Sequence, residues 1–234
     1  MNKLIMGFLL AAPLLAQDAR AIVEESQKRT RADSQRYEGT LEVIDSKRKV
    51  TLKRWMYERL GAAGESKAVL RFTAPAEVKG VALLIHNHPD RASDQWMWTP
   101  AVQRERRIAF QDRRTRFFGT DFTFEDLEER DVDRSTYKLL GEEQMMGAAC
   151  WKIESTPKPE ARSQYSRSLL WIRKDNYVIT QAEGYGRDKD KLVRRIRYSD
   201  IAQVQGIWTP RLLEVHDIAR DSRTVMKLER LQYN

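Results

Sequence analysis

The sequence predicts a mainly β protein in which one helix precedes an antiparallel meander. Short segments of alternating apolar and polar residues recur about every 8–14 residues, and Gly, Pro, Asn or Asp separate them. No strand pattern alternates with a long helical pattern, so a parallel sheet is not expected. The chain has 234 residues, of which 41% are hydrophobic, a size at which a single all-β domain is ordinary.

The first residues have the order of a secretory signal peptide. A positive start that includes Lys3 is followed by an uncharged apolar run, residues 4–15, and then by the small residue Ala16. The run is too short for a membrane span, which needs about 20 residues. We expect a signal peptide over residues 1–16 and one domain over residues 17–234, with cleavage after Ala16 or after Ala21. The alternative is a buried N-terminal helix.

The mature chain is expected to begin with a helix over residues 18–34, which has only a narrow apolar stripe. Thr123 and Asp126 resemble a capping box, so a short helix is expected near residues 123–129. The expected strands cover residues 40–44, 50–57, 68–72, 81–85, 95–99, 107–110, 137–140, 149–153, 168–172, 177–182, 192–198, 207–208, 211–216 and 224–231.

Charge and cysteine content narrow the classes of function. The net charge is +8, but 42 Lys and Arg are mixed with 34 Asp and Glu along the chain, as on a solvated surface. An exported protein meets little nucleic acid, so we expect lipid headgroups, and no nucleic acid, as the anionic partner. The single cysteine, Cys150, excludes an internal disulfide and any zinc site built on Cys pairs, and it is expected to be buried.

Few residues suggest catalysis. His86 and His88 would share a strand face and could touch a metal, but no third ligand is marked nearby, and a polar strand end is the simpler interpretation. Asp121 and Glu125 could form an acid/base pair, as in a periplasmic hydrolase, or could cap a helix and balance arginines. We expect no catalytic residue, no metal and no cofactor.

Arginines form the strongest charge cluster of the chain. They could bind lipid phosphates or an acidic partner, or they could pair internally with the acidic residues that follow them. The cluster consists of Arg104, Arg106, Arg107, Arg113, Arg114 and Arg116.

Tryptophans are the remaining signal. Two interpretations stay open, a packed core and the wall of an apolar cavity. The six residues fall on expected strands and are Trp55, Trp96, Trp98, Trp151, Trp171 and Trp208.

Several motifs, taken in order, resemble the bacterial outer-membrane lipoprotein-sorting proteins, the LolA-like carriers. Met97 and Trp98 stand where Leu and Tyr are more usual, which keeps the apolar character. The motifs are FTAPAEVKGVALL at residues 72–84, DQWMWTPA at 94–101, RRI at 106–108, FGTDFTFEDL at 118–127, Tyr137, LLG at 139–141, CW at 150–151 and GIWTP at 206–210.

The resemblance implies an α+β fold, mainly β: an incomplete, strongly curved antiparallel β-barrel whose concave face is covered by the N-terminal helix and short helices. It also implies a soluble periplasmic carrier that shields acyl chains of lipoproteins or of another envelope lipid during transfer to the outer membrane. An inner-membrane transporter and an outer-membrane acceptor would be its partners. The alternative is a structural or adaptor protein of an envelope transport complex that carries no lipid.

Strand alternation then gives candidate cavity residues. We expect residues 18–34 and 123–129 to act as a weakly packed lid over the cavity. The expected lining residues are Leu70, Phe72, Trp96, Trp98, Ile108, Phe110, Leu213 and Val215.

Overall fold

The computed structural model describes residues 18–62, 64–89, 91–129 and 131–234. The expected signal peptide, residues 1–16, lies outside these ranges. None of the described helices is long and apolar enough to cross a membrane.

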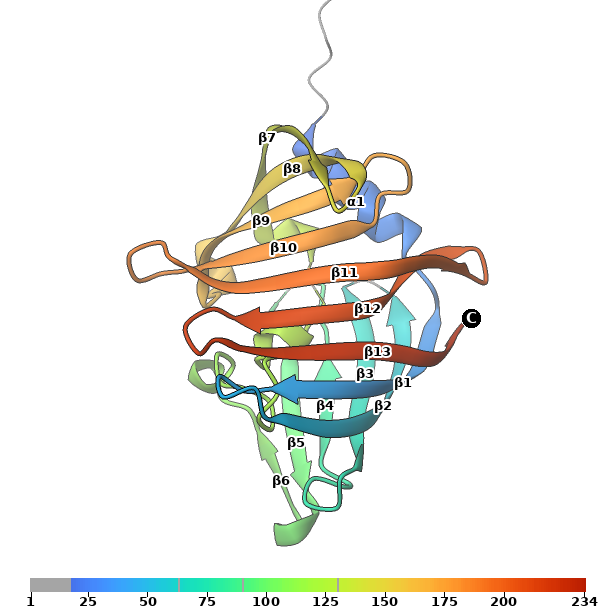
Figure 1. The fold of residues 1–234 in the computed structure, drawn as a ribbon, viewed down its shortest axis with the longest axis vertical. Coiled ribbons are helices and arrows are strands. Elements are labelled where there is room, and N and C mark those ends of the chain that lie inside the picture. Colours follow the sequence, from blue (N-terminus) through green and yellow to red (C-terminus); the bar gives the residue numbers. More distant parts are fainter. Residues whose placement is uncertain (1–17, 63, 90, 130) are drawn as a thin grey trace, which may run out of the picture.

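Within the described ranges, thirteen strands form one open antiparallel sheet, which confirms the expected fold class (Figure 1). The strands are β1 (Ser34–Ile44), β2 (Val50–Ala62), β3 (Glu65–Ala74), β4 (Ala82–His86), β5 (Asp94–Thr99), β6 (Arg104–Arg107), β7 (Ser135–Met145), β8 (Ala148–Pro157), β9 (Tyr165–Arg173), β10 (Ile179–Gly186), β11 (Leu192–Val204), β12 (Ile207–Asp217) and β13 (Ser222–Tyr233).

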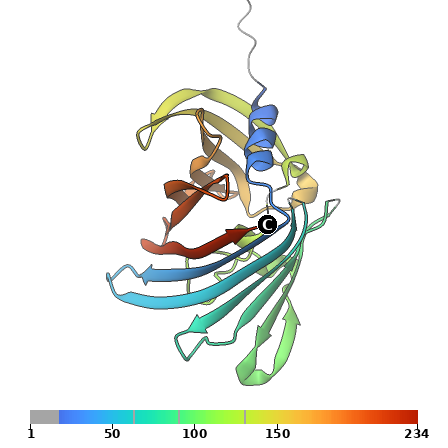
Figure 2. The same cartoon turned by 90° about the vertical axis from the view of Figure 1, so that its right-hand side faces the viewer.

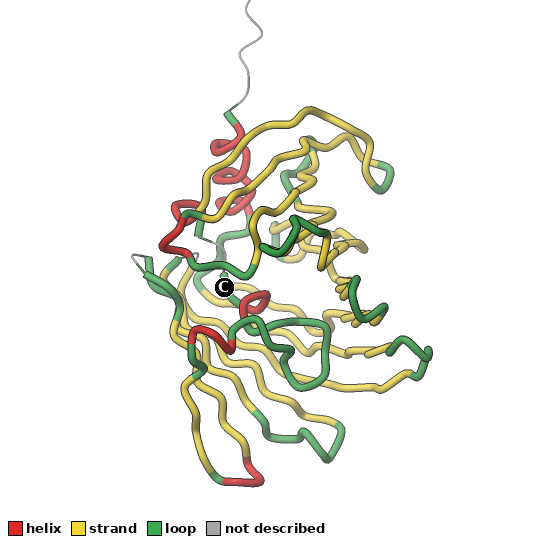
Figure 3. The backbone as a smooth tube through the Cα atoms, turned by 90° about the vertical axis from the view of Figure 1, so that its left-hand side faces the viewer, coloured by secondary structure: helices red, strands yellow, loops and turns green. Residues whose placement is uncertain are grey.

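The order of the strands explains why the sheet stays open. Neighbouring strands follow one another along the chain except at the centre, where β1 pairs with β13. The two outer strands, β6 and β7, are therefore joined directly by the loop of residues 108–134 instead of by hydrogen bonds. The strands twist continuously from one edge to the other, and the sheet curls into a half-barrel (Figures 2 and 3).

The concave, or inner, face of the sheet carries the core. In one register row, Leu170 lies opposite Ala182, Ala182 opposite Ile196, and Ile196 opposite Val215. All four side chains are at most 5% exposed. Because side chains alternate between the two faces of a strand, most charged residues of these strands lie on the outer face. Arg194 of β11 is an exception, since it is buried on the inner face.

Two segments cover the inner face. The helix α1 (Ala19–Arg29) packs Ile22 and Val23 against β8, β9 and β10. Asp18 caps it, since its carboxylate accepts a hydrogen bond of 3.0 Å from the backbone N of Arg20. The 108–134 loop packs three buried phenylalanines, Phe117, Phe122 and Phe124, against the half of the sheet that contains β1 to β5.

Short 3₁₀ helices complete the described residues, and two of them correct sequence-based expectations. Residues 107–110 do not form a strand: β6 ends at Arg107, and Phe110 begins a 3₁₀ helix. The capping pair Thr123 and Asp126 is confirmed by mutual hydrogen bonds, but it introduces a single 3₁₀ turn. These helices are η1 (Pro100–Val102), η2 (Phe110–Asp112), η3 (Glu125–Leu127), η4 (Val132–Arg134) and η5 (Pro159–Ala161).

Candidate functional site

An apolar cavity of about 270 Å³ lies between the inner face of the sheet and the 108–134 loop. Alternation brings its walls together: Tyr37 of β1 is the register partner of Tyr57 of β2, and their rings stack with centroids 4.8 Å apart. We call this space the apolar compartment. Its apolar lining consists of Tyr37, Trp55, Tyr57, Leu70, Ile85, Phe122, Leu127, Trp208, Pro210, Leu213, Met226, Leu228 and Tyr233.

A second space of about 400 Å³, the middle compartment, adjoins the first. Tyr57, Leu127 and Tyr233 line both spaces. Ser26 and Gln27 of α1, together with its C-cap residue Thr30, line the middle compartment opposite the loop. The helix therefore lies over the route between the apolar compartment and the rest of the cleft.

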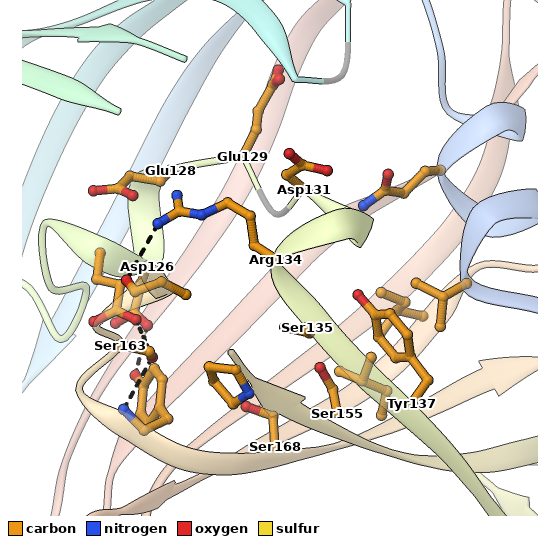
Figure 4. Close-up of a pocket in the computed structure, with 18 of the residues that line it drawn as sticks. Asp126, Glu128, Glu129, Asp131, Arg134, Ser135, Tyr137, Ser155, Ser163 and Ser168 are labelled. Atoms are coloured by element: carbon orange, nitrogen blue, oxygen red, sulfur yellow. Dashed lines mark hydrogen bonds between the residues drawn. The ribbon is translucent and has the colours of Figure 1, made fainter. Parts of the chain in front are cut away.

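A third space of about 140 Å³, the polar compartment, adjoins the middle one and shares Gln27, Glu128 and Glu129 with it (Figure 4). Serine hydroxyls, carboxylates and two guanidinium groups, those of Arg113 and Arg134, line it. The three compartments together form a cleft whose walls are mainly aromatic and aliphatic at one end and carry serines, carboxylates and arginines beside apolar side chains at the other, an arrangement that suits an amphiphile.

Buried Asp121 fastens the loop to the sheet. Its side chain is not exposed, and its carboxylate accepts hydrogen bonds from Ser222 (2.6 Å), Thr224 (2.8 Å) and Arg116 (3.0 Å). A carboxylate whose oxygens are engaged in this way is an anchor, which is the structural role that the sequence left open.

The 108–134 loop is a fixed wall and not the weakly packed lid expected at residues 123–129. Thr123 is fully buried, and Asp126 accepts a hydrogen bond of 2.7 Å from the Tyr165 hydroxyl on β9. Arg194 of β11 lies 3.4 Å from the Asp126 carboxylate. The strands β9 and β11 thus hold this segment through side chains that the periodicity of the sequence does not connect.

Burial also raises the pKa values of tyrosine hydroxyls in the cleft. Because Tyr37 and Tyr57 are buried among apolar side chains, their pKa values lie above the ordinary value. The pKa of Tyr165 is raised mainly by burial as well, with the charge of Asp126 adding to the effect. These hydroxyls therefore stay protonated, and able to form hydrogen bonds, at any moderate pH.

Of the eight expected cavity residues, the structure places some in the wall of the cleft, some in the core and some outside the cleft. Leu70 and Leu213 line the apolar compartment, and Phe72, Ile108 and Val215 are buried in the core of the same face. Phe110 is 39% exposed on η2, beneath the guanidinium groups of Arg113 and Arg162. The remaining two, Trp96 and Trp98, do not line the cleft.

Trp96 and Trp98 lie on the outer face of β5. Trp96 is opposite Leu84, whose side chain is 37% exposed, while Met97 is opposite the fully buried Leu83. The expected inward orientation of Trp96 and Trp98 is wrong, because residues 96–98 are apolar on both faces of the strand and their alternation is ambiguous. The inner face of this strand carries Gln95 and Met97 instead.

The aromatic and apolar residues contributed by β1, β2 and β13 were missed. Tyr37, Tyr57, Met226 and Leu228 line the apolar compartment. Tyr57, Met226 and Leu228 fall within expected strands, whereas Tyr37 precedes the strand expected at residues 40–44 and lies in β1. The pairing of β1 with β13, which places them around one space, has no local signal in the sequence.

The arginine cluster is not one surface. Arg113 is buried and paired with Glu128, and Arg116 is bonded to Asp121. Arg107 pairs with Asp94, and Arg106 lies 3.4 Å from Asp112. Internal pairing thus accounts for four of the six, while Arg104 and Arg114 are exposed.

His86 and His88 lie side by side, as their spacing predicts, with ring centroids 4.0 Å apart. His88 contacts Asp94 at 3.1 Å. Among the described residues, no group of three His, Cys, Asp or Glu side chains could hold a metal ion. Cys150 is buried as expected, and burial raises the pKa of its thiol.

Comparisons with known proteins agree with this architecture. A family model described as "Uncharacterized protein" matches residues 64–234. A DUF1329 family protein from Desulfovibrio piger is 26% identical over 92% of each chain, with a TM-score of 0.88. No curated protein matches the chain.

Two further solved structures share the fold. An outer membrane lipoprotein-sorting protein domain from Vibrio parahaemolyticus is 22% identical over 92% of each chain, with a TM-score of 0.86. A LolA superfamily protein from Nitrosomonas europaea is 20% identical over 94% of each chain, with a TM-score of 0.73. The chain therefore belongs to the family whose model matches residues 64–234, and its fold is that of the outer-membrane lipoprotein-sorting, LolA-like proteins.

Proposed function

We propose that the protein is a carrier that shields the acyl chains of an envelope lipid or lipoprotein from water. The apolar compartment carries this proposal, since aromatic and aliphatic side chains line a space of about 270 Å³ that adjoins a larger one under α1. Each methylene that leaves water for such a space contributes about 0.8 kcal/mol. The cleft therefore supplies affinity for a hydrocarbon chain without any catalytic group.

A carrier must also release its cargo, and the two covers of the inner face differ in a way that supports this. The 108–134 loop is tied to β9, β11 and β13 by buried polar groups, namely Tyr165, Arg194 and Asp121. The helix α1 buries only Ala19, Ile22, Val23 and Ser26. We assign the role of movable lid to α1 alone, with the loop as the fixed wall.

The place of action is part of the proposal. Export through a signal peptide ending at Ala16 would leave α1 complete, with Asp18 as its cap and Ala19 buried beneath it. Cleavage after Ala21 would remove the first turn of the helix. A periplasmic carrier of this kind would receive its cargo from an inner-membrane transporter and deliver it to an outer-membrane acceptor.

Mass spectrometry of an organic extract tests the proposal. The mature protein, purified from a bacterial periplasm without detergent, should release acyl-bearing lipid in a constant molar ratio to protein. A matched extract of the Leu213→Asp variant, which places a charge in the apolar compartment, should contain much less. Protein that is free of lipid and also fails to bind an added fluorescent fatty acid would reject the carrier and favour an adaptor without cargo.

A further inference from the structure

The floor of the polar compartment carries two serine hydroxyls from neighbouring strands. Ser155 of β8 and Ser168 of β9 lie opposite each other in the sheet register and are 9% and 8% exposed. Both line the compartment. A serine hydroxyl can both donate and accept a hydrogen bond, so these groups favour a ligand that brings hydrogen-bonding atoms.

Arg134 offers a guanidinium group to the same space. Figure 4 shows its side chain above the strands that carry Ser155 and Ser168. It donates one hydrogen bond of 3.3 Å to the Ala161 carbonyl oxygen and has no ion pair with any described carboxylate. Its neighbour Arg113, in contrast, is paired with Glu128 and unavailable. An unpaired, half-buried guanidinium is a preferred partner of a phosphate group.

Two carboxylates of the lining complement this cation. Glu125 accepts hydrogen bonds only from neutral donors, the Ser163 hydroxyl and the backbone N of Gln164. Asp131 accepts one of 2.9 Å from the backbone N of Asp133. Neither has an ion pair with a described cation, so the compartment presents free negative charge beside the free guanidinium of Arg134.

We propose that the polar compartment binds the zwitterionic head of a phospholipid, with the phosphate at Arg134 and a primary ammonium at Glu125 and Asp131. The hydroxyls of Ser155 and Ser168 donate to the phosphate oxygens, and the acyl chain runs through the middle compartment into the apolar one. The volume of about 140 Å³ suits a small head. This inference rests on the proposed acyl-carrier function and names the chemical class of its cargo.

A displacement assay with the mature protein tests it. A fluorescent fatty acid is bound first, and then lipids of identical acyl chains compete: phosphatidylethanolamine, phosphatidylglycerol and diacylglycerol. We expect phosphatidylethanolamine to compete about tenfold better than phosphatidylglycerol, which corresponds to about 1.4 kcal/mol, and diacylglycerol to compete least. Equal competition by all three, with the probe still bound, would overturn the head-group assignment alone. Failure to bind the probe at all would overturn the carrier function.

Single substitutions test the phosphate contact and the ammonium contact of the lipid head group separately. Arg134→Gln should weaken phosphatidylethanolamine and phosphatidylglycerol alike and leave diacylglycerol unchanged. Asp131→Asn should lower only the preference for phosphatidylethanolamine over phosphatidylglycerol. Arg114→Gln, at an exposed position of the 108–134 loop, is the matched control and should change nothing. Unchanged lipid preferences in both test variants, with thermal unfolding like that of the parent, would contradict the assignment.

Discussion

Trp55 lies flat across Gly39, its register partner on the neighbouring strand. A Cβ atom at Gly39 would come within 2.7 Å of Cδ1 of the indole. The glycine thus lets a large aromatic side chain lie against the sheet and form the wall of the apolar compartment. Gly184 serves Tyr165 in the same way, since a Cβ atom there would lie 2.5 Å from Cε1 of the ring. In both cases the glycine has no side chain, and the aromatic ring therefore has room to lie against the sheet.

Gly39→Ala should therefore disturb the cleft and the fold together. The added methyl forces the indole of Trp55 away from the sheet, and overpacking of this kind costs about 1–3 kcal/mol. Urea unfolding measures the cost, and tryptophan fluorescence reports the displaced ring. Thr40→Ala, at the next position on the opposite face, is the control. Equal stability of the two variants would show that the indole can move without penalty.

A charge in the apolar compartment should abolish acyl binding, whereas the same charge on the outer face should not. Leu213 lines the compartment and Trp98 is 39% exposed on the outside of β5. Leu213→Asp must desolvate a carboxylate when a chain enters, so affinity for a fluorescent fatty acid should fall at least tenfold. Trp98→Asp should leave it unchanged. A larger effect from Trp98→Asp would show that the acyl chain binds on the outer face of the sheet and would contradict the proposed site.

The sequence predicts the strands well, because each one is a local alternation of apolar and polar residues, as at Leu70 and Phe72. It fails where that local signal is ambiguous or absent. The run of Trp96, Met97 and Trp98 is apolar in both phases, so only the pairing of β5 with β4 decides which side chain faces inward. The pairing of β1 with β13 and the anchoring of Asp121 join residues about 100 or more positions apart, which no local pattern encodes.

Removing the anchor of the loop should destabilise the whole fold. Asp121→Ala leaves the Ser222 and Thr224 hydroxyls without this acceptor in the interior and removes the carboxylate that pairs with Arg116, and loss of one partner of a buried ion pair costs about 3–5 kcal/mol. The midpoint of urea unfolding should fall accordingly. Asp121→Asn keeps the size and one acceptor oxygen, so it should cost less. If both variants were as stable as the parent, the loop would not depend on this contact.

Acid should weaken the fold partly through Asp94. Hydrogen bonds from Arg91, Arg107 and His88 hold the pKa of this carboxyl well below its usual range, against the opposing effect of burial. A depressed pKa contributes stability above the unfolded value of about 3.9 and loses it as pH falls toward the folded value. Asp94→Asn should thus cost about 2 kcal/mol at pH 7 and progressively less between pH 4 and pH 2. The exposed Asp188→Asn should show no such trend, and a constant difference across this range would contradict the assignment.

The helix α1 should open independently of the sheet. Its side-chain attachments include the buried Ile22 and Val23, the ion pair of Arg20 with Asp133, and Arg29 over the ring of Tyr177 at 4.1 Å. Segments with few buried contacts exchange their amide hydrogens through local opening. Amides of residues 19–29 should exchange faster than those of β8 and β9, and an added fatty acid should slow them, because the ligand lies beneath the helix. Ile22→Ala should speed both exchange and ligand release, whereas Lys28→Ala on the exposed side should not. Exchange in α1 that is as slow as in the sheet, or that a bound ligand leaves unchanged, would mean that the helix is a fixed part of the wall and that cargo enters elsewhere.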